Sequence, residues 1–143
     1  MQARTILPTL QTTTISLQRE AFDPAAEAAL LTRSRTDIGA VVSFTGICRA
    51  DESGEAIAAL TLEHYPGMAE AEIARHVEAA NARWRLLGVT VIHRYGRMVP
   101  GEAIVLVVTA SGHRQAALHR AGWGERRGHR TTLSEIVWSS SMA

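Results

Sequence analysis

The feature that most constrains the fold is the run from Glu102 to Ala110, EAIVLVVTA, in which almost every residue is apolar. Strands that are buried on both faces have continuous apolar runs of this kind, whereas half-exposed strands alternate apolar and polar residues. The run therefore predicts a central strand in a sheet that is covered by other elements.

The segments before this run predict a series of strands and helices. Further strands are predicted over four segments: 12–18, 39–46, 57–64 and 88–95. One helix is predicted from Pro24, with Asp23 as its N-terminal cap, and a longer one from Met68 to about Arg85, where apolar residues recur every three or four positions. Residues 50–55 predict a loop and residues 97–101 a turn. The order β-α-β-β-α-β-β predicts an α+β fold, with a mostly antiparallel or mixed sheet covered by helices, in a single domain over residues 1–143.

The composition limits the classes of function. A 46% hydrophobic content is typical of globular proteins, and a formal net charge of +1 argues against a nucleic-acid binder. No apolar run approaches the roughly 20 residues that span a bilayer. Cys48 is the single cysteine, so no internal disulfide is possible. We expect a cytoplasmic protein without membrane or nucleic-acid partners, whose arginines can still form a site for a small anion.

Two places present cationic side chains after apolar strands. Gly46 lets the strand 39–46 turn or approach a ligand closely, which delivers Arg49 at the mouth of a loop. His113 and Arg114 follow the central strand at a predicted helix start, where an imidazole, a guanidinium and free N–H groups suit a phosphate or carboxylate. Each feature taken alone also fits a solvated loop, with Ser111 as a helix cap.

Other reactive side chains have structural explanations beside the functional ones. His64 ends a strand, where it relays protons or makes a structural hydrogen bond. Cys48 is an activated thiolate beside Arg49 or, as is usual in strands, a small apolar residue. His93 packs and Arg94 forms an ion pair within a strand. The six histidines show no metal-binding spacing, so no metal site is predicted.

The last third of the chain changes character. Residues 115–120 are typical of a helix start, but three glycines follow within seven residues and the arginines leave no apolar stripe. Residues 131–138 are compatible with a short strand. The arginines and tryptophans of this tail leave open an RNA-binding alternative, through stacking and phosphate contacts.

Four segments carry a resemblance to a known family. They are GAVVSFTGICR (39–49), LTLEHYPGMAEAEI (60–73), VTVIHRYGRMVPGEAIVLV (89–107) and SGHR (111–114). In order and spacing they resemble the large, catalytic subunit of molybdopterin synthase, over about residues 10–118.

The resemblance implies a fold, a reaction and partners. The fold is an α/β hammerhead, and large subunits form a central homodimer in which each binds a small ubiquitin-like sulfur-carrier subunit, giving a heterotetramer. The carrier's C-terminal thiocarboxylate supplies two sulfurs to cyclic pyranopterin monophosphate, which becomes molybdopterin in molybdenum cofactor biosynthesis. No separate cofactor is implied.

The resemblance also implies site residues. Arg49, with the backbone of Ile47 and Cys48, corresponds to the family's loop that contacts the pterin substrate, and Phe44 corresponds to a wall of the pocket. His113 and Arg114 correspond to a His-Arg pair that completes the pocket of the neighbouring subunit.

The tail departs from the family. Members carry two catalytic lysines there, whereas all 15 basic residues of this chain are arginines, which cannot act as nucleophiles or proton donors. The catalytic residues are therefore left unassigned. Three explanations stay open: an altered sequence over residues 119–143, a homologue that binds the carrier or dimerises without turnover, and chemistry rerouted through His119 or His129.

Overall fold

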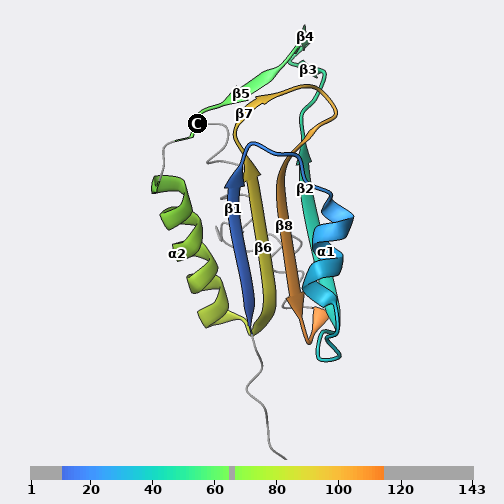
Figure 1. The fold of residues 1–143 in the computed structure, drawn as a ribbon, viewed down its shortest axis with the longest axis vertical. Helices are drawn as coiled ribbons and strands as arrows, with labels where there is room; N and C mark the ends of the chain where they lie inside the picture. Colours follow the sequence, from blue (N-terminus) through green and yellow to red (C-terminus); the bar gives the residue numbers. More distant parts are fainter. Residues whose placement is uncertain (1–10, 65–66, 115–143) are drawn as a thin grey trace, which may run out of the picture.

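A computed structural model describes residues 11–64 and 67–114, which form a sheet with helices on it and a smaller extension at one end (Figure 1). The elements are β1 (Thr12–Gln18), α1 (Pro24–Thr32), β2 (Ala40–Ile47), β3 (Asp51–Glu52), β4 (Glu55–Ala56), β5 (Leu60–Leu62), α2 (Met68–Arg83), β6 (Leu86–Arg94), β7 (Gly96–Met98) and β8 (Ala103–Ser111).

The main sheet has four strands in the order β1-β6-β8-β2. β8 pairs antiparallel with both β6 and β2, while β1 pairs parallel with β6. The predicted central strand and mixed sheet are therefore confirmed. Residues Ile104 to Ser111 of β8 are all buried, which explains why its sequence is apolar on both faces.

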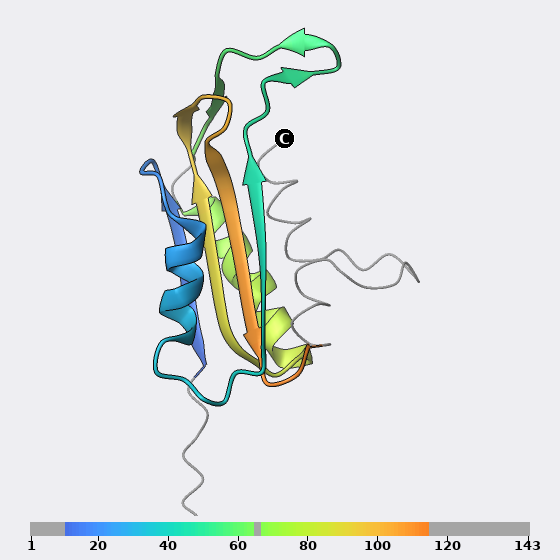
Figure 2. The ribbon, with the colours of Figure 1, turned by 90° about the vertical axis from the view of Figure 1, so that its right-hand side faces the viewer.

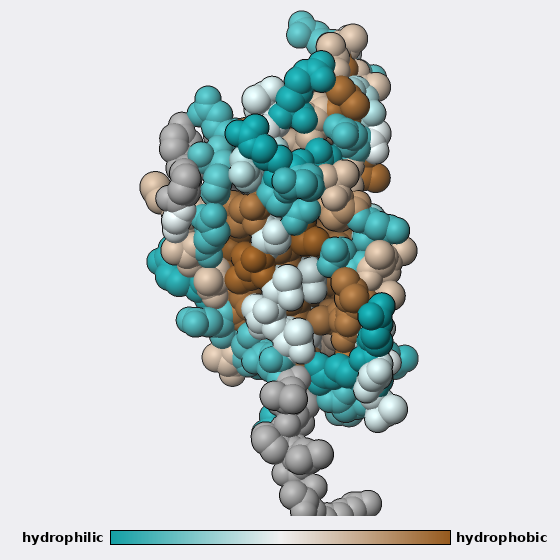
Figure 3. Space-filling view, viewed as in Figure 1, coloured by the Kyte–Doolittle hydropathy of each residue, from teal (hydrophilic) through white to brown (hydrophobic). Residues whose placement is uncertain are grey.

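The two faces of the sheet carry separate apolar clusters, because successive side chains of a strand point to opposite sides. The cluster under α2 joins Ile73, Val77 and Ala80 of that helix to Leu86, Val89, Val91, Val105 and Val107 of the sheet. The cluster under α1 joins Leu31 of that helix to Ile92, Leu106, Val108 and Ala110 of the sheet. The two helices cover opposite faces (Figure 2), and the space-filling view shows apolar side chains gathered over the sheet between them (Figure 3). The alternation of odd and even positions in β6 and β8 thus places one helix on each side.

Local sequence signals fix the helix starts. The Asp23 carboxylate accepts the backbone N–H of Ala25 at 3.0 Å, with Pro24 in the first turn, as predicted. α2 begins after Gly67, which has a φ of 89° that favours glycine, and Glu70 Oε2 accepts the Gly67 N–H at 2.9 Å.

The segment between β2 and α2 differs from the sequence prediction. Residues 51–56 form a hairpin of two short strands instead of a loop, turning at Ser53 and Gly54, both with positive φ. The strand expected over residues 57–64 is restricted to β5, which pairs with β7. This pairing brings Leu60 and Leu62 against a third cluster of Cys48, Met98 and Ile104. The hairpin extends beyond the main sheet at the end where β2 stops (Figure 2).

The elements expected in residues 115–120 and 131–138 lie outside the described residues. Within the described part, neither helix is both long and apolar enough to cross a membrane.

Leu106→Ala tests the importance of the double-faced burial of β8. Leu106 is fully buried in the cluster under α1, so removing its side chain leaves a cavity, and we expect a loss of about 2–5 kcal/mol in the free energy of unfolding. Urea denaturation measures it. The matched control is Leu30→Ala on α1, because Leu30 is 56% exposed, and its expected effect is within about 0.5 kcal/mol. Equal losses in the two variants would contradict the assignment of β8 as the central strand.

Candidate functional site

Arg49 stands just beyond the end of β2. The β2–β8 register shifts between Gly46 and Ile47, and after this irregularity the chain leaves the sheet. The Arg49 side chain is 68% exposed and lies 3.7 Å from the carboxylate of Glu52 in the hairpin. An exposed pair of this kind is weak in water, so the guanidinium can exchange Glu52 for a ligand anion.

The residues that precede Arg49 have different environments. Ile47 is 51% exposed, whereas Cys48 is buried with Met98 and Ile104. The Cys48 N–H donates to the Glu102 carbonyl at 2.9 Å, and the Cys48 carbonyl accepts the Gly101 N–H at 2.8 Å. The backbone of Cys48 therefore anchors the loop to the β7–β8 turn, and its N–H is already engaged within the chain.

Phe44 lies on the face of the sheet that α2 covers. It pairs in register with Val107 and packs, partly buried, against the apolar cluster on that face. Within the chain, Phe44 is thus a packing residue on the same strand that delivers Arg49.

His113 and Arg114 lie at the opposite end of the sheet. They follow Ser111, which pairs with Ala40 at the start of β2, and both are exposed. The His113 N–H donates to Ser111 Oγ at 3.3 Å, as expected for the capping serine. From Ala40 to Ile47 the extended chain spans about 23 Å at 3.3 Å per residue. One chain therefore does not bring Arg49 together with His113 and Arg114.

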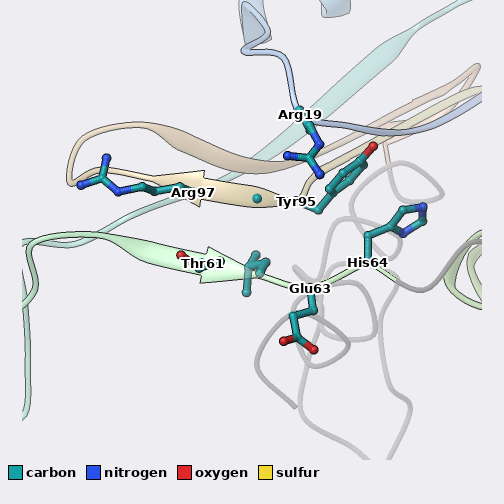
Figure 4. Close-up of a pocket in the computed structure, with 8 residues that line it drawn as sticks. Arg19, Thr61, Glu63, His64, Tyr95 and Arg97 are labelled. Carbon is teal, nitrogen blue, oxygen red and sulfur yellow. The ribbon is translucent and has the colours of Figure 1, made fainter.

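A third group, which the sequence did not predict, lines an open pocket of about 650 Å³. The lining residues are Arg19, Thr61, Leu62, Glu63, His64, Tyr95, Gly96 and Arg97 (Figure 4). They come from the end of β1, from β5 and from β7. His64 was considered from sequence alone, but nothing in the pattern indicated that Arg19 and Tyr95 would meet it, because they belong to elements distant along the chain.

Two buried titratable side chains of β6, Arg94 and His93, have structural roles. Arg94 is 6% exposed, and its guanidinium donates to the carbonyls of Arg19 and Ala103 and lies 3.7 Å from the Glu102 carboxylate. The expected ion pair of Arg94 is therefore confirmed. The His93 ring lies buried, with Nδ1 2.9 Å from the Arg94 carbonyl. Burial lowers the pKa of His93, and the nearby His64 adds to the lowering, against the hydrogen bond to Arg94, which raises the pKa.

The comparisons with known proteins agree with one another. The family model described as MoaE protein matches residues 17–123. A "Molybdopterin synthase catalytic subunit" of Mesorhizobium japonicum is 55% identical over 137 residues, covering 87% of this chain and 84% of the relative. One of Rhizobium meliloti is 60% identical over 110 residues, covering 77% and 70%. The solved "Molybdopterin biosynthesis MoaE protein" of Burkholderia ambifaria superposes with a TM-score of 0.69 at 36% identity, covering 78% of this chain and 73% of that one.

Gly39→Ala tests how the His113–Arg114 loop is held. A Cβ at Gly39 would collide with the Gly112 carbonyl oxygen, so the loop has to shift, and we expect a loss of about 1–3 kcal/mol in the free energy of unfolding. Backbone amide NMR shifts of His113 and Arg114 should move as well. Ser43→Ala, at an exposed position of β2, which begins directly after Gly39, is the control. Unchanged shifts in Gly39→Ala would contradict the close approach.

His93→Gln tests the buried imidazole. Because its pKa in the folded protein lies below the ordinary 6.5, the unfolded chain binds the proton more readily. The contribution of the buried neutral imidazole to the free energy of unfolding is therefore complete above about pH 6.5, and it is lost as the pH falls below that value. We expect the free energy of unfolding of the unmodified protein to fall more between pH 7.5 and pH 5 than that of His93→Gln, as measured by urea denaturation. Parallel pH profiles would refute the assignment.

Proposed function

The chain belongs to the MoaE protein family, and from this membership we propose the reaction, partners and site residues of this chain. It acts as the large, catalytic subunit of molybdopterin synthase. A small ubiquitin-like carrier subunit presents its thiocarboxylated C-terminus, and two sulfurs are transferred to cyclic pyranopterin monophosphate to give molybdopterin. The match to catalytic subunits over most of the chain is the observation that carries the proposal.

Arg49 binds an anion of the reactants, and its position supports this role. A guanidinium provides up to five fixed N–H donors and stays charged at any physiological pH, which suits the cyclic phosphate or the carrier carboxylate. The exposure of Arg49 leaves it accessible, and the anchoring of Cys48 by Glu102 and Gly101 fixes the loop from which it extends. Ile47, half exposed beside it, supplies apolar contact for the pterin, with Phe44 as the pocket wall behind.

His113 and Arg114 complete the pocket of a second large subunit. This part of the proposal is supported by their separation from Arg49 along the whole length of β2. A two-fold homodimer repeats every contact, so two sites would form, each combining Arg49 of one subunit with His113 and Arg114 of the other. In such a site His113 is the group able to take or give a proton, while Arg114 holds negative charge.

The catalytic residues are left unassigned, because the two lysines that catalyse the reaction in the family are absent from this sequence. Arginine cannot form the covalent link to the carrier that an amine forms. His119 and His129 lie outside the described residues. The alternative is a homologue that binds the carrier subunit or dimerises without turnover, and single-turnover kinetics separates the two. The site of action is the cytoplasm in both cases.

A single-turnover assay with thiocarboxylated carrier and cyclic pyranopterin monophosphate tests the reaction. We expect molybdopterin to form, and Arg49→Ala to slow its formation by about 100-fold, as is usual for loss of a charged contact to reacting groups. Arg75→Ala, at an exposed position of α2, should leave the rate unchanged. Carrier binding without product would establish the non-catalytic alternative, and neither binding nor product would exclude both.

A mixing experiment tests the shared site. Arg49→Ala and His113→Ala subunits, each with little activity alone, should recover activity when denatured together and refolded. At equal amounts half of the dimers are mixed and each contains one intact site, which gives about a quarter of the unmodified activity. A mixture that stays as inactive as its parents would contradict a site shared between two subunits.

A further inference from the structure

The pocket between the end of β1 and the β5–β7 pair is separate from the proposed sulfur-transfer site. None of Phe44, Ile47, Cys48 or Arg49 lines it, and His113 lies at the opposite end of the sheet. Its volume of about 650 Å³ falls within the range of small-molecule sites, roughly 300–1,000 Å³. The volume therefore suits a small organic molecule.

Arg19 is held in this pocket by an aromatic ring. Its guanidinium carbon lies 5.1 Å from the centroid of the Tyr95 ring, a cation–π distance. Gly96 has a φ of 85°, and a Cβ added to it would lie 3.7 Å from Arg19 Nη1, so the guanidinium occupies the space beside this glycine. A guanidinium stacked in this way keeps the N–H groups along its edge available for an anion.

Tyr95 is itself fixed from its other side. The His64 ring stacks on it, with centroids 4.5 Å apart and an interplanar angle of 24°. His64 Nε2 lies 3.4 Å from Glu70 Oε1, and the other oxygen of Glu70 accepts the Gly67 N–H at the start of α2. Glu70, His64, Tyr95 and Arg19 thus form a continuous series of contacts from the first turn of α2 into the pocket. Figure 4 shows its last three members, His64, Tyr95 and Arg19.

The charges of the pocket favour an anion. Arg35, Arg49 and Arg94 each lie within 4 Å of a carboxylate. Neither Arg19 nor Arg97 has such a partner among residues 11–64 and 67–114, and Glu63 is the one carboxylate among the lining residues. Arg97 is exposed farther along β7, directly opposite Thr61 of β5 in the register (Figure 4).

We propose that this pocket binds a small organic phosphate. Arg19, preorganised on Tyr95, holds the phosphate through its guanidinium edge, and Arg97 with the Thr61 hydroxyl contacts polar groups of the ligand farther along β7. A phosphate dianion suits the Arg19 guanidinium better than a carboxylate does, since it has more acceptor oxygens, and its second negative charge is also attracted by Arg97. The inference goes beyond the proposed sulfur transfer and does not depend on it.

Titration calorimetry of the full chain with phenyl phosphate tests the proposal, with benzoate and inorganic phosphate as parallel probes. We expect saturable binding of phenyl phosphate, at least tenfold weaker in Arg19→Gln, about threefold weaker in Arg97→Gln and unchanged in the exposed control Arg75→Gln. Benzoate should bind more weakly than phenyl phosphate. Inorganic phosphate should also bind more weakly, because it lacks the organic part that the pocket accommodates.

Tyr95→Leu tests whether the ring of Tyr95 orients the Arg19 guanidinium for binding or whether Arg19 acts only through its positive charge. It keeps both arginines but removes the ring under Arg19, and we expect binding to weaken about two- to fivefold, as is typical of losing a cation–π contact at a partly exposed site. Circular dichroism confirms that each variant is folded.

Three results would overturn the proposal: no saturable binding of phenyl phosphate, equal affinity in Arg19→Gln and Arg75→Gln, or loss of binding in Arg49→Gln. The last would assign the phosphate to the Arg49 site instead. The proposed function fails separately, through the absence of molybdopterin formation in the single-turnover assay.

Discussion

The burial of β8 on both faces is the constraint on which the described structure depends. A strand with apolar side chains on both sides is stable only when its two edges are paired and its two faces are covered. β6 and β2 pair with the edges, and the clusters under α1 and α2 cover the faces. The close contact of Leu31 with Gly88, where a Cβ would lie 2.6 Å from Leu31 Cδ1, shows how closely α1 is seated on β6.

The antiparallel pairing of β2 with β8 has a consequence for function. Because the strands run in opposite directions, the residues that follow β2 and those that follow β8 emerge at opposite ends of the sheet. Arg49 and the pair His113–Arg114 are therefore separated by the same ladder that stabilises the core. A fold of this kind assembles such groups into one site only by contact between subunits, which is why a dimer is part of the proposed function.

The elements that sequence predicted are those with strong local signals. The apolar run of β8, the spacing of apolar residues in α2 and the Asp23–Pro24 start of α1 each depend on neighbours along the chain. The two-residue strands β3 and β4 are too short to show a pattern, so their segment was predicted as a loop. The Arg19–Tyr95–His64 stack depends on the pairing of β5 with β7, which no local signal encodes. The sequence shows that Cys48 precedes Arg49, but it does not show that the Cys48 N–H donates to the Glu102 carbonyl. That hydrogen bond forms because the β7–β8 turn lies beside the loop.

Because the sequence contains no lysine, its basic side chains are those of arginine and histidine. Arginine binds anions without titrating, whereas histidine is the side chain type whose ordinary pKa lies nearest to neutral pH. Among the histidines of the described segments, His93 is buried with a lowered pKa, and His64 contacts Glu70 and Tyr95. His76 Nε2 lies 3.9 Å from the Glu72 carboxylate one turn earlier on α2. His113 is exposed beside Arg114, and its backbone N–H donates to Ser111 Oγ. In the proposed function His113 is the proton-transferring group, and because β2 separates it from Arg49 within one chain, it acts on an anion held by Arg49 only in a site that two subunits share.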